Sequence, residues 1–129
     1  MIKYNESLQK YDYILSFDLA KHTTGWALVD IKNSQVIMSD VIISDDSKES
    51  LWDDLYQRFV TVFKRVQQYC GDNNKSFFVV KEKLPAQAGA FTTIASLQAL
   101  AGVHAVWELA CCHMHIPTYD YEGVHSVSV

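Results

Sequence analysis

The sequence is poor in the features that mark secreted and membrane-spanning proteins. It has three cysteines among 129 residues, an odd number, and Cys111 and Cys112 are adjacent, so it contains no spaced disulfide framework. Residues 1–6 lack the apolar core of a secretory signal. No apolar run approaches the roughly 18 residues needed to span a bilayer. These absences predict a protein of the reducing cytoplasm that has no membrane partner.

Basic charge is scarce as well. The formal net charge of -4 argues against a surface covered with phosphate-binding lysine and arginine. A nuclease can nevertheless be acidic in bulk and carry a local basic rim around its site. With 49% hydrophobic and 20% charged residues, the chain is excluded from the disordered class. Its length is that of one domain.

Three runs of strand-forming residues lie close together in the first third of the chain. Residues 13–17 form an apolar run typical of a buried strand, and residues 26–29 resume an extended pattern after Gly25. Residues 36–43 follow a turn at residues 32–34. Because the connections are short, these runs predict an antiparallel meander.

Two helices and two further strands follow. Apolar residues recur at three- and four-residue spacing from Leu51 to Tyr69, after Ser50 as N-cap and before Gly71 as terminator. The remaining elements are a buried strand at 77–80, a second long helix from about 93 to 112, and a last strand at 116–119. The order β-β-β-α-β-α-β predicts an α/β sheet whose first three strands are antiparallel. The later strands, which are joined through helices, should be parallel.

Asp18 directly follows the first buried strand, where the chain leaves the sheet. Ligand and metal sites in α/β folds gather at strand ends, because a rigid backbone there presents side chains to solvent. An acid that ends an apolar strand therefore indicates a functional site. The alternative is that Asp18 only opens a turn, with its carboxylate accepting hydrogen bonds from nearby backbone N–H groups.

Glu82 occupies the equivalent place after the strand at 77–80. Carboxylates at the ends of neighbouring strands repel each other unless a proton or a cation lies between them. Mg²⁺, a hard cation that prefers carboxylate oxygen and water, meets that requirement. Asp18 and Glu82 are therefore the candidate catalytic and metal-binding residues. The alternative for Glu82 is a solvated edge acid flanked by Lys81 and Lys83.

Several segments in order resemble the RuvC family of Holliday junction resolvases, including its phage members, which have a ribonuclease-H-like fold. The run from Phe17 to Ala27 is similar to the family's catalytic aspartate, short loop and Thr-Gly start of the second strand. The other matching segments are 79–82, similar to the central strand with its catalytic glutamate, 97–103, similar to a Gln-Ala…Gly helix, and 116–121, similar to the following strand. In that last segment Asp120 takes a non-catalytic position. The resemblance covers most of the chain from Tyr13 onward.

The resemblance implies an N-terminal extension at residues 1–12 and one ribonuclease-H-like domain at residues 13–129. The family carries further catalytic acids on a C-terminal helix, and no acid of this chain matches those positions. Two-metal chemistry needs enough carboxylates to hold both ions around the phosphate, so Asp18 and Glu82 alone would hold one ion well and a second poorly. We expect either a C-terminally truncated fragment of a longer protein, which we favour, or an inactive member.

With a complete set of acids, the resemblance implies Mg²⁺-dependent hydrolysis of phosphodiesters in branched DNA, with Mn²⁺ able to substitute. One ion would activate a water molecule and the other would stabilise the leaving 3′ oxygen. A homodimer is implied too, because a four-way junction needs two symmetric cuts. The lysines that could contact backbone phosphates are Lys10, Lys21, Lys81 and Lys83; the alternative is ordinary solvated charge.

Two further features favour structural explanations. The tract from Cys111 to His115 contains metal-binding residue types, but consecutive residues at a helix end point in different directions, so we expect no metal site there. Trp26, Trp52 and Trp107 have rings of the kind that stack on bases, yet each falls on a predicted buried face. We expect all three to pack in the core.

Two other functions remain open. Actin-like and sugar-kinase ATPases share the ribonuclease-H-like core, but their first hairpin has Asp-x-Gly, because glycine lets backbone amides approach phosphates. Ala20 stands two residues after Asp18 here, and such ATPases need two of these domains. The second alternative is a non-catalytic binding module that keeps the fold without the chemistry, which the incomplete set of acids favours.

Overall fold

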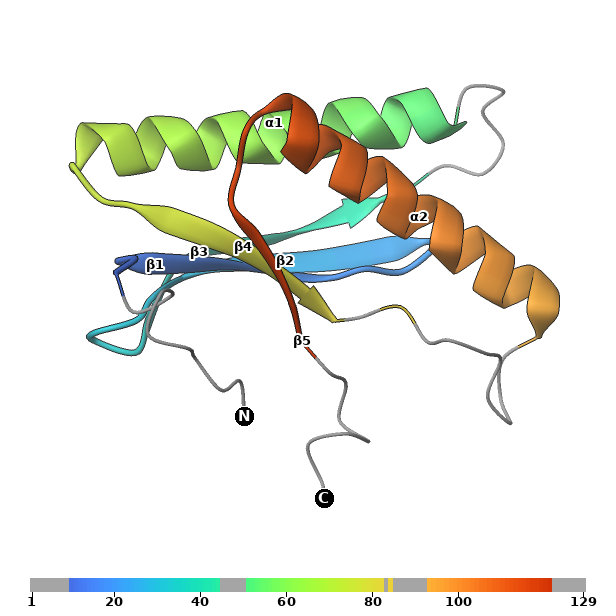
Figure 1. Ribbon diagram of the computed structural model, residues 1–129, viewed down its shortest axis with the longest axis horizontal. Helices are drawn as coiled ribbons and strands as arrows, with labels where there is room; N and C mark the ends of the chain where they lie inside the picture. Colours follow the sequence, from blue (N-terminus) through green and yellow to red (C-terminus); the bar gives the residue numbers. More distant parts are fainter. Residues whose placement is uncertain (1–9, 45–50, 83, 85–92, 122–129) are drawn as a thin grey trace, which may run out of the picture.

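The computed structural model describes residues 10–44, 51–82, 84 and 93–121, which form a five-stranded sheet and two long helices (Figure 1). In chain order the elements are β1 (Tyr13–Asp18), β2 (Thr23–Asp30), β3 (Gln35–Ile43), α1 (Leu51–Asp72), β4 (Phe77–Glu82), α2 (Ile94–His113) and β5 (Thr118–Tyr121). The strand order is β3-β2-β1-β4-β5. The pairs β1–β2 and β2–β3 are antiparallel, whereas β1–β4 and β4–β5 are parallel. The predicted fold class, an antiparallel meander continued by parallel strands, is confirmed.

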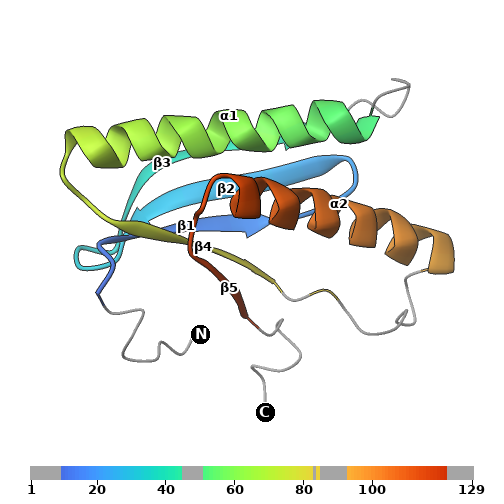
Figure 2. The ribbon, with the colours of Figure 1, turned by 45° about the horizontal axis from the view of Figure 1, so that its top comes forward.

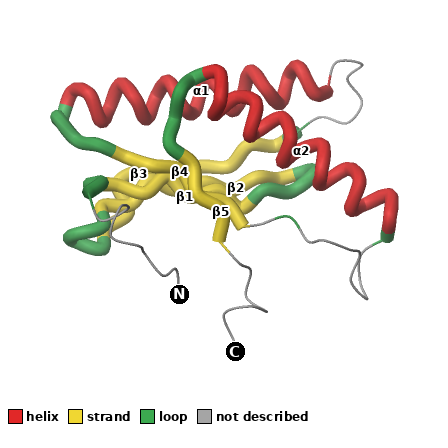
Figure 3. The backbone as a smooth tube through the Cα atoms, in the orientation of Figure 1, coloured by secondary structure: helices red, strands yellow, loops and turns green. Residues whose placement is uncertain are grey.

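Both helices lie on the same face of the sheet, so the described residues form two layers (Figures 2 and 3). The alternation of side chains along β1 accounts for this arrangement. Leu15 and Phe17 point to the helices and belong to the main core. Ile14 points to the opposite face, where it packs with Phe78 and Val80 of β4. We call this opposite side the open face, because neither α1 nor α2 covers it.

Phe17 is the centre of the main core. Its side chain is 0% exposed and meets three aromatic rings edge-on, at centroid distances of 6.0 Å to Phe59, 5.5 Å to Phe63 and 5.7 Å to Trp107. Edge-to-face aromatic contacts add to the free energy gained by burying the rings. Since the first two partners come from α1 and the third from α2, both helices fix the end of β1.

The first helix, α1, has the predicted amphipathic pattern. Its buried residues recur at three- and four-residue spacing: Leu55, Phe59, Val62, Phe63, Val66 and Cys70. The helix ends at Asp72, one residue after the predicted terminator Gly71. A glycine does not provide the left-handed residue that follows the helix. Asn74 does, with φ of 55°, while Lys75 N–H donates to the Cys70 carbonyl at 2.8 Å. The predicted N-cap, Ser50, lies outside the described residues.

The second helix, α2, starts as predicted, because the Thr93 hydroxyl accepts a hydrogen bond from Ser96 N–H at 3.0 Å. Its buried residues all lie in its C-terminal two thirds, whereas Ile94 and Leu109 are exposed. The expectation that no segment is long and apolar enough to span a bilayer is wrong for α2, which meets both criteria. In its most apolar window 28% of the residues are buried. Core helices of soluble proteins pass the same test, so length and composition alone are weak evidence for a membrane span.

Trp52 corrects the prediction that all three tryptophans are buried. Trp26 and Trp107 are in the core, but Trp52 is 44% exposed. The buried part of its indole packs on Gly102 of α2, where an added Cβ would lie 2.6 Å from the ring atom Cη2. Glycine therefore permits the close approach of the start of α1 to α2.

The last strand, β5, begins two residues later than predicted. Ile116 is buried in the core, and Pro117, which has no N–H to donate, accepts a hydrogen bond from Val79 N–H at 2.9 Å through its carbonyl. Pairing with β4 therefore begins at Pro117, and the regular strand starts at Thr118.

Candidate metal centre

Asp18 and Glu82 end two strands that lie side by side and run in the same direction. Asp18 is the last residue of β1 and Glu82 the last of β4, and the register pairs Phe17 with Lys81 immediately before them. Continuing this register by one residue brings Asp18 opposite Glu82. Both side chains are exposed, and both follow a residue that faces the helices, so both belong to the open face. The sheet thus places the two acids that the sequence singled out at the ends of adjacent parallel strands.

The loop between Asp18 and Gly25 is closed by Thr24. The buried Thr24 hydroxyl donates to the Ala20 carbonyl at 3.2 Å and accepts from Ala20 N–H at 3.3 Å. These bonds give a physical reason for the threonine in the Thr-Gly pair. Since Thr24 makes the bonds that close the loop, the Asp18 carboxylate stays exposed at the strand end.

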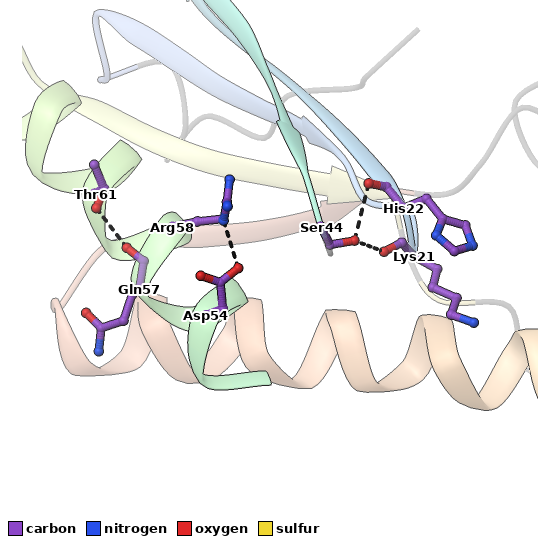
Figure 4. A network of polar contacts seen from close by, with 7 residues as sticks. All are labelled: Lys21, His22, Ser44, Asp54, Gln57, Arg58 and Thr61. Atoms are coloured by element: carbon purple, nitrogen blue, oxygen red, sulfur yellow. Dashed lines mark hydrogen bonds and ion pairs between the residues drawn. The ribbon is translucent and has the colours of Figure 1, made fainter. Parts of the chain in front are cut away.

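The same loop is held from its other side by Ser44, at the end of β3. Ser44 N–H donates to the His22 carbonyl at 2.9 Å. Its hydroxyl is within hydrogen-bonding distance of the Lys21 and His22 carbonyls (Figure 4). The loop that follows Asp18 is therefore tied both to β2 and to β3, which limits the freedom of the acid before it.

An open groove of about 340 Å³ adjoins Asp18. It is lined by Ser16, Asp18, Gly25, Trp26, Ala27, Ser39, Asp40 and Val41. Most of these side chains are small, and a Cβ added at Gly25 would meet nothing within 4 Å. The sheet surface beside Asp18 therefore has room for a substrate backbone to approach the acid.

The residues present fit one magnesium ion. Asp18 and Glu82 offer hard carboxylate oxygens from two rigid strands, and Mg²⁺ is commonly held by one or two carboxylates together with waters and substrate phosphates. Within the described ranges, no group of three or more His, Cys, Asp or Glu residues is placed to hold a metal ion. Among the described residues the site is thus made of two carboxylates.

The four lysines considered for phosphate contact lie in different environments. Lys81 is 2% exposed and faces the helices, so the interpretation of Lys81 as a DNA contact is wrong. Its ammonium pairs with Glu108 of α2 at 3.3 Å and Asp120 of β5 at 3.1 Å. Lys21 lies on the exposed loop after Asp18, and Lys10 is exposed with its ammonium over the Tyr11 ring. Lys83 lies outside the described residues.

The cysteine and histidine tract at the end of α2 spreads its side chains over the core and the surface. Cys111 is buried, and burial raises the pKa of its thiol to about 12, whereas Cys112 is exposed. The Nδ1 atom of His113 lies 2.7 Å from the Tyr56 hydroxyl of α1. These side chains serve packing and the contact between α1 and α2.

Sequence reasoning missed the buried polar group around His104. Its Nδ1 atom is buried without a hydrogen-bond partner in the described structure. Burial, and next the charge of Lys81, lower the pKa of His104, while Glu108 and Asp120 act in the opposite direction. The burial of Lys81 beside His104 could have been predicted from the sequence. Alternation along β4 places residues 77, 79 and 81 on the face that packs against the helices.

The lowered pKa of His104 predicts a pH-dependent stability. Above the unfolded-state pKa of about 6.5 the imidazole is neutral in both states. As pH falls below that value the unfolded chain takes up a proton that the folded chain resists, so the free energy of unfolding decreases. Urea unfolding between about pH 7.5 and about pH 5 should show a shallower decline for His104→Leu than for the unchanged chain. Equal slopes for the two proteins would contradict this role of His104.

Comparison with known proteins places the fold. No protein-family model and no curated protein matches the sequence. Among solved structures, Thermus thermophilus RuvC in complex with a Holliday junction substrate is similar over 90% of this chain and 68% of that one, with a TM-score of 0.69 and 11% identity. A second structure of T. thermophilus RuvC is similar over 85% of this chain and 63% of that one, with a TM-score of 0.63 and 11% identity. An Aquifex aeolicus member of the Ppx/GppA family reaches a TM-score of 0.49 at 12% identity, over 88% of this chain and 36% of that one. At such identities the likeness concerns structure alone, and it shows that this chain has the ribonuclease-H-like fold that RuvC has.

Proposed function

We propose that this chain belongs to a metal-dependent, structure-selective endonuclease that cleaves phosphodiesters in branched DNA. The observation that carries the proposal is the placement of Asp18 and Glu82 as the last residues of the adjacent parallel strands β1 and β4. The sheet that holds them is similar to that of a resolvase whose structure contains a Holliday junction substrate. Fold alone does not establish function, so the proposal depends on the two acids.

The chain's own residues would bind and orient the reactants. Mg²⁺, when bound, would supply charge stabilisation at the phosphate and a more acidic water molecule. Asp18 and Glu82 would hold that ion on two strands whose ends are fixed by the core. Gly25 and the small side chains of the groove would admit the sugar-phosphate backbone next to Asp18. Lys21, on the exposed loop after Asp18, is the lysine best placed to meet a phosphate of the same strand.

The described acids account for one ion. Two-metal chemistry needs further carboxylates, so cleavage requires acids in addition to Asp18 and Glu82. We also propose that the active protein is a homodimer, because a four-way junction is two-fold symmetric and needs two matched cuts. Metal binding and cleavage are therefore separate questions and need separate measurements.

Two assays test the proposal. Mn²⁺ binding, followed by electron paramagnetic resonance of the free ion, asks whether Asp18 and Glu82 form a metal site. Cleavage of a labelled four-way DNA at increasing Mg²⁺ concentration asks whether the chemistry is present, with a linear duplex of the same sequence as the control substrate. We expect Mn²⁺ binding by this chain. In a protein that also carries the further acids, we expect cleavage of the four-way DNA that chelation of the metal abolishes. ATP binding would support the nucleotide-binding alternative, and the absence of every one of these activities would support a non-catalytic module.

A further inference from the structure

Lys81 is the one lysine, arginine, aspartate or glutamate buried in the described part of the chain. Its ammonium lies 3.3 Å from a Glu108 carboxylate oxygen and 3.1 Å from an Asp120 carboxylate oxygen. It also lies 5.5 Å from the centre of the Trp107 ring. A cation from β4 is thus held by acids of α2 and β5 and by an aromatic face of α2.

Burial of this ammonium is costly, so its presence needs an explanation other than general stability. Taking a charge out of water costs free energy that ion pairing only partly returns, and well-packed apolar residues often stabilise such positions better. The two carboxylate partners are each about half exposed, so they do not require Lys81 for their own solvation. The lysine therefore contributes something that an apolar side chain at this position would not.

The place of Lys81 in the sheet shows what that contribution is. It stands one residue before Glu82, between Phe17 of β1 and Asp120 of β5 in the register. The outer strand β5 is four residues long, so few backbone hydrogen bonds attach it to the end of β4. The ion pair between Lys81 and Asp120 joins the two strands at this point, and the pair with Glu108 joins them to α2.

We infer that Lys81 is a positioning residue for the metal centre: its buried ion pairs with Glu108 and Asp120 fix the end of β4 and so hold Glu82 opposite Asp18. The inference rests on the proposed metal-dependent function. Lys81 acts from the helix-covered face, while Glu82 belongs to the open face, so Lys81 does not touch the metal or the substrate. Its effect on the site is transmitted through the backbone of β4.

Metal affinity at a temperature where every variant is fully folded tests this inference. Lys81→Met keeps the length of the side chain and removes the charge, and we expect it to weaken Mn²⁺ binding about tenfold, as is usual when a residue that supports a metal ligand is lost. Lys81→Arg keeps both ion pairs possible and should recover most of the affinity. Lys64→Met, which removes an exposed lysine of α1, is the matched control and should bind Mn²⁺ like the unchanged chain.

Asp120→Asn provides a second variant that does not depend on the folding of Lys81→Met. It leaves Lys81 paired with Glu108 alone, so we expect a smaller loss of Mn²⁺ affinity than for Lys81→Met. In a protein that also carries the further acids, the variants should lower kcat for four-way DNA and leave KM unchanged, because Lys81 does not contact the substrate. A purely structural role would lower the melting temperature without changing the metal affinity of the folded protein.

Each outcome decides the matter. Unchanged Mn²⁺ affinity in both Lys81→Met and Asp120→Asn overturns the inference and leaves the proposed function intact. Equal losses in Lys81→Met and Lys64→Met also overturn it, since the effect would then not depend on the ion pairs of Lys81. A loss that Lys81→Arg does not reduce contradicts the role of the ion pairs. If the unchanged chain binds no Mn²⁺, the proposed function fails and the inference fails with it.

Discussion

In a protein that carries the complete set of catalytic acids, Asp18→Asn is expected to lower metal-dependent cleavage of four-way DNA by at least about a hundredfold while leaving the protein folded. Asparagine has the size of aspartate but no charge, so it loses the electrostatic attraction of the carboxylate for a divalent cation. A bound ion contributes several kcal/mol of charge stabilisation in the transition state, and each 1.36 kcal/mol corresponds to about tenfold in rate. Because the Asp18 side chain is exposed and outside the core, its replacement should leave the free energy of unfolding nearly unchanged.

The measurement compares initial cleavage rates at saturating Mg²⁺, together with urea unfolding of the same preparations. Asp53→Asn, in the exposed first turn of α1, removes one negative charge far along the chain from either strand end and serves as the control. The control should cleave at the rate of the unchanged chain. Full activity in Asp18→Asn would remove the basis for a metal centre at this strand end.

Phe17→Ala is expected to cost about 3–5 kcal/mol of stability, the range for removing a large aromatic side chain from a core. The ring is fully buried and meets aromatic rings from both helices, so its loss leaves a cavity that neither helix can fill alone. In a domain of this size such a loss consumes much of the total stability, so we expect unfolding at markedly lower urea concentration or failure to fold.

Val41→Ala is the matched control for this measurement, because Val41 is an exposed apolar residue of the edge strand β3. Its free energy of unfolding should differ from that of the unchanged chain by no more than about 0.5 kcal/mol. Similar losses for the two variants would contradict the placement of Phe17 at the centre of the core.

Local sequence patterns predicted the elements and the two acids well, for identifiable reasons. Strand alternation and helical spacing report directly which side chains are covered, so β1, α1 and β4 appeared within one or two residues of their observed bounds. Asp18 and Glu82 stood out because each ends an apolar run. Their proximity followed from the parallel pairing of β1 with β4, which the intervening helix required.

Other features depended on contacts between distant elements, which periodicity does not report. Trp52 precedes Phe59 by two turns on the same face of α1, so helical spacing predicted that it is buried. Its indole packs on Gly102 of α2, however, and part of the ring stays exposed. Lysines are usually at the surface, and that general preference outweighed the alternation that places Lys81 with Val79 on the covered face. Its partners, Glu108 and Asp120, come from elements that follow in the chain and could not be matched to it in advance.

The register of β1 and β4 also shows what kind of sequence change the site can bear. In β1, Phe17 faces the core and the next residue, Asp18, faces the open face. In β4, Lys81 faces the helices and the next residue, Glu82, faces the open face. A substitution in either strand alters one side chain, but inserting or deleting a single residue within the strand exchanges every core-facing side chain beyond it for an outward-facing one. The positions of the two acids thus depend on the alternation of side chains along each strand as much as on the residue types. A change in the number of residues inside β1 or β4 would therefore disrupt the site even if every residue type were kept.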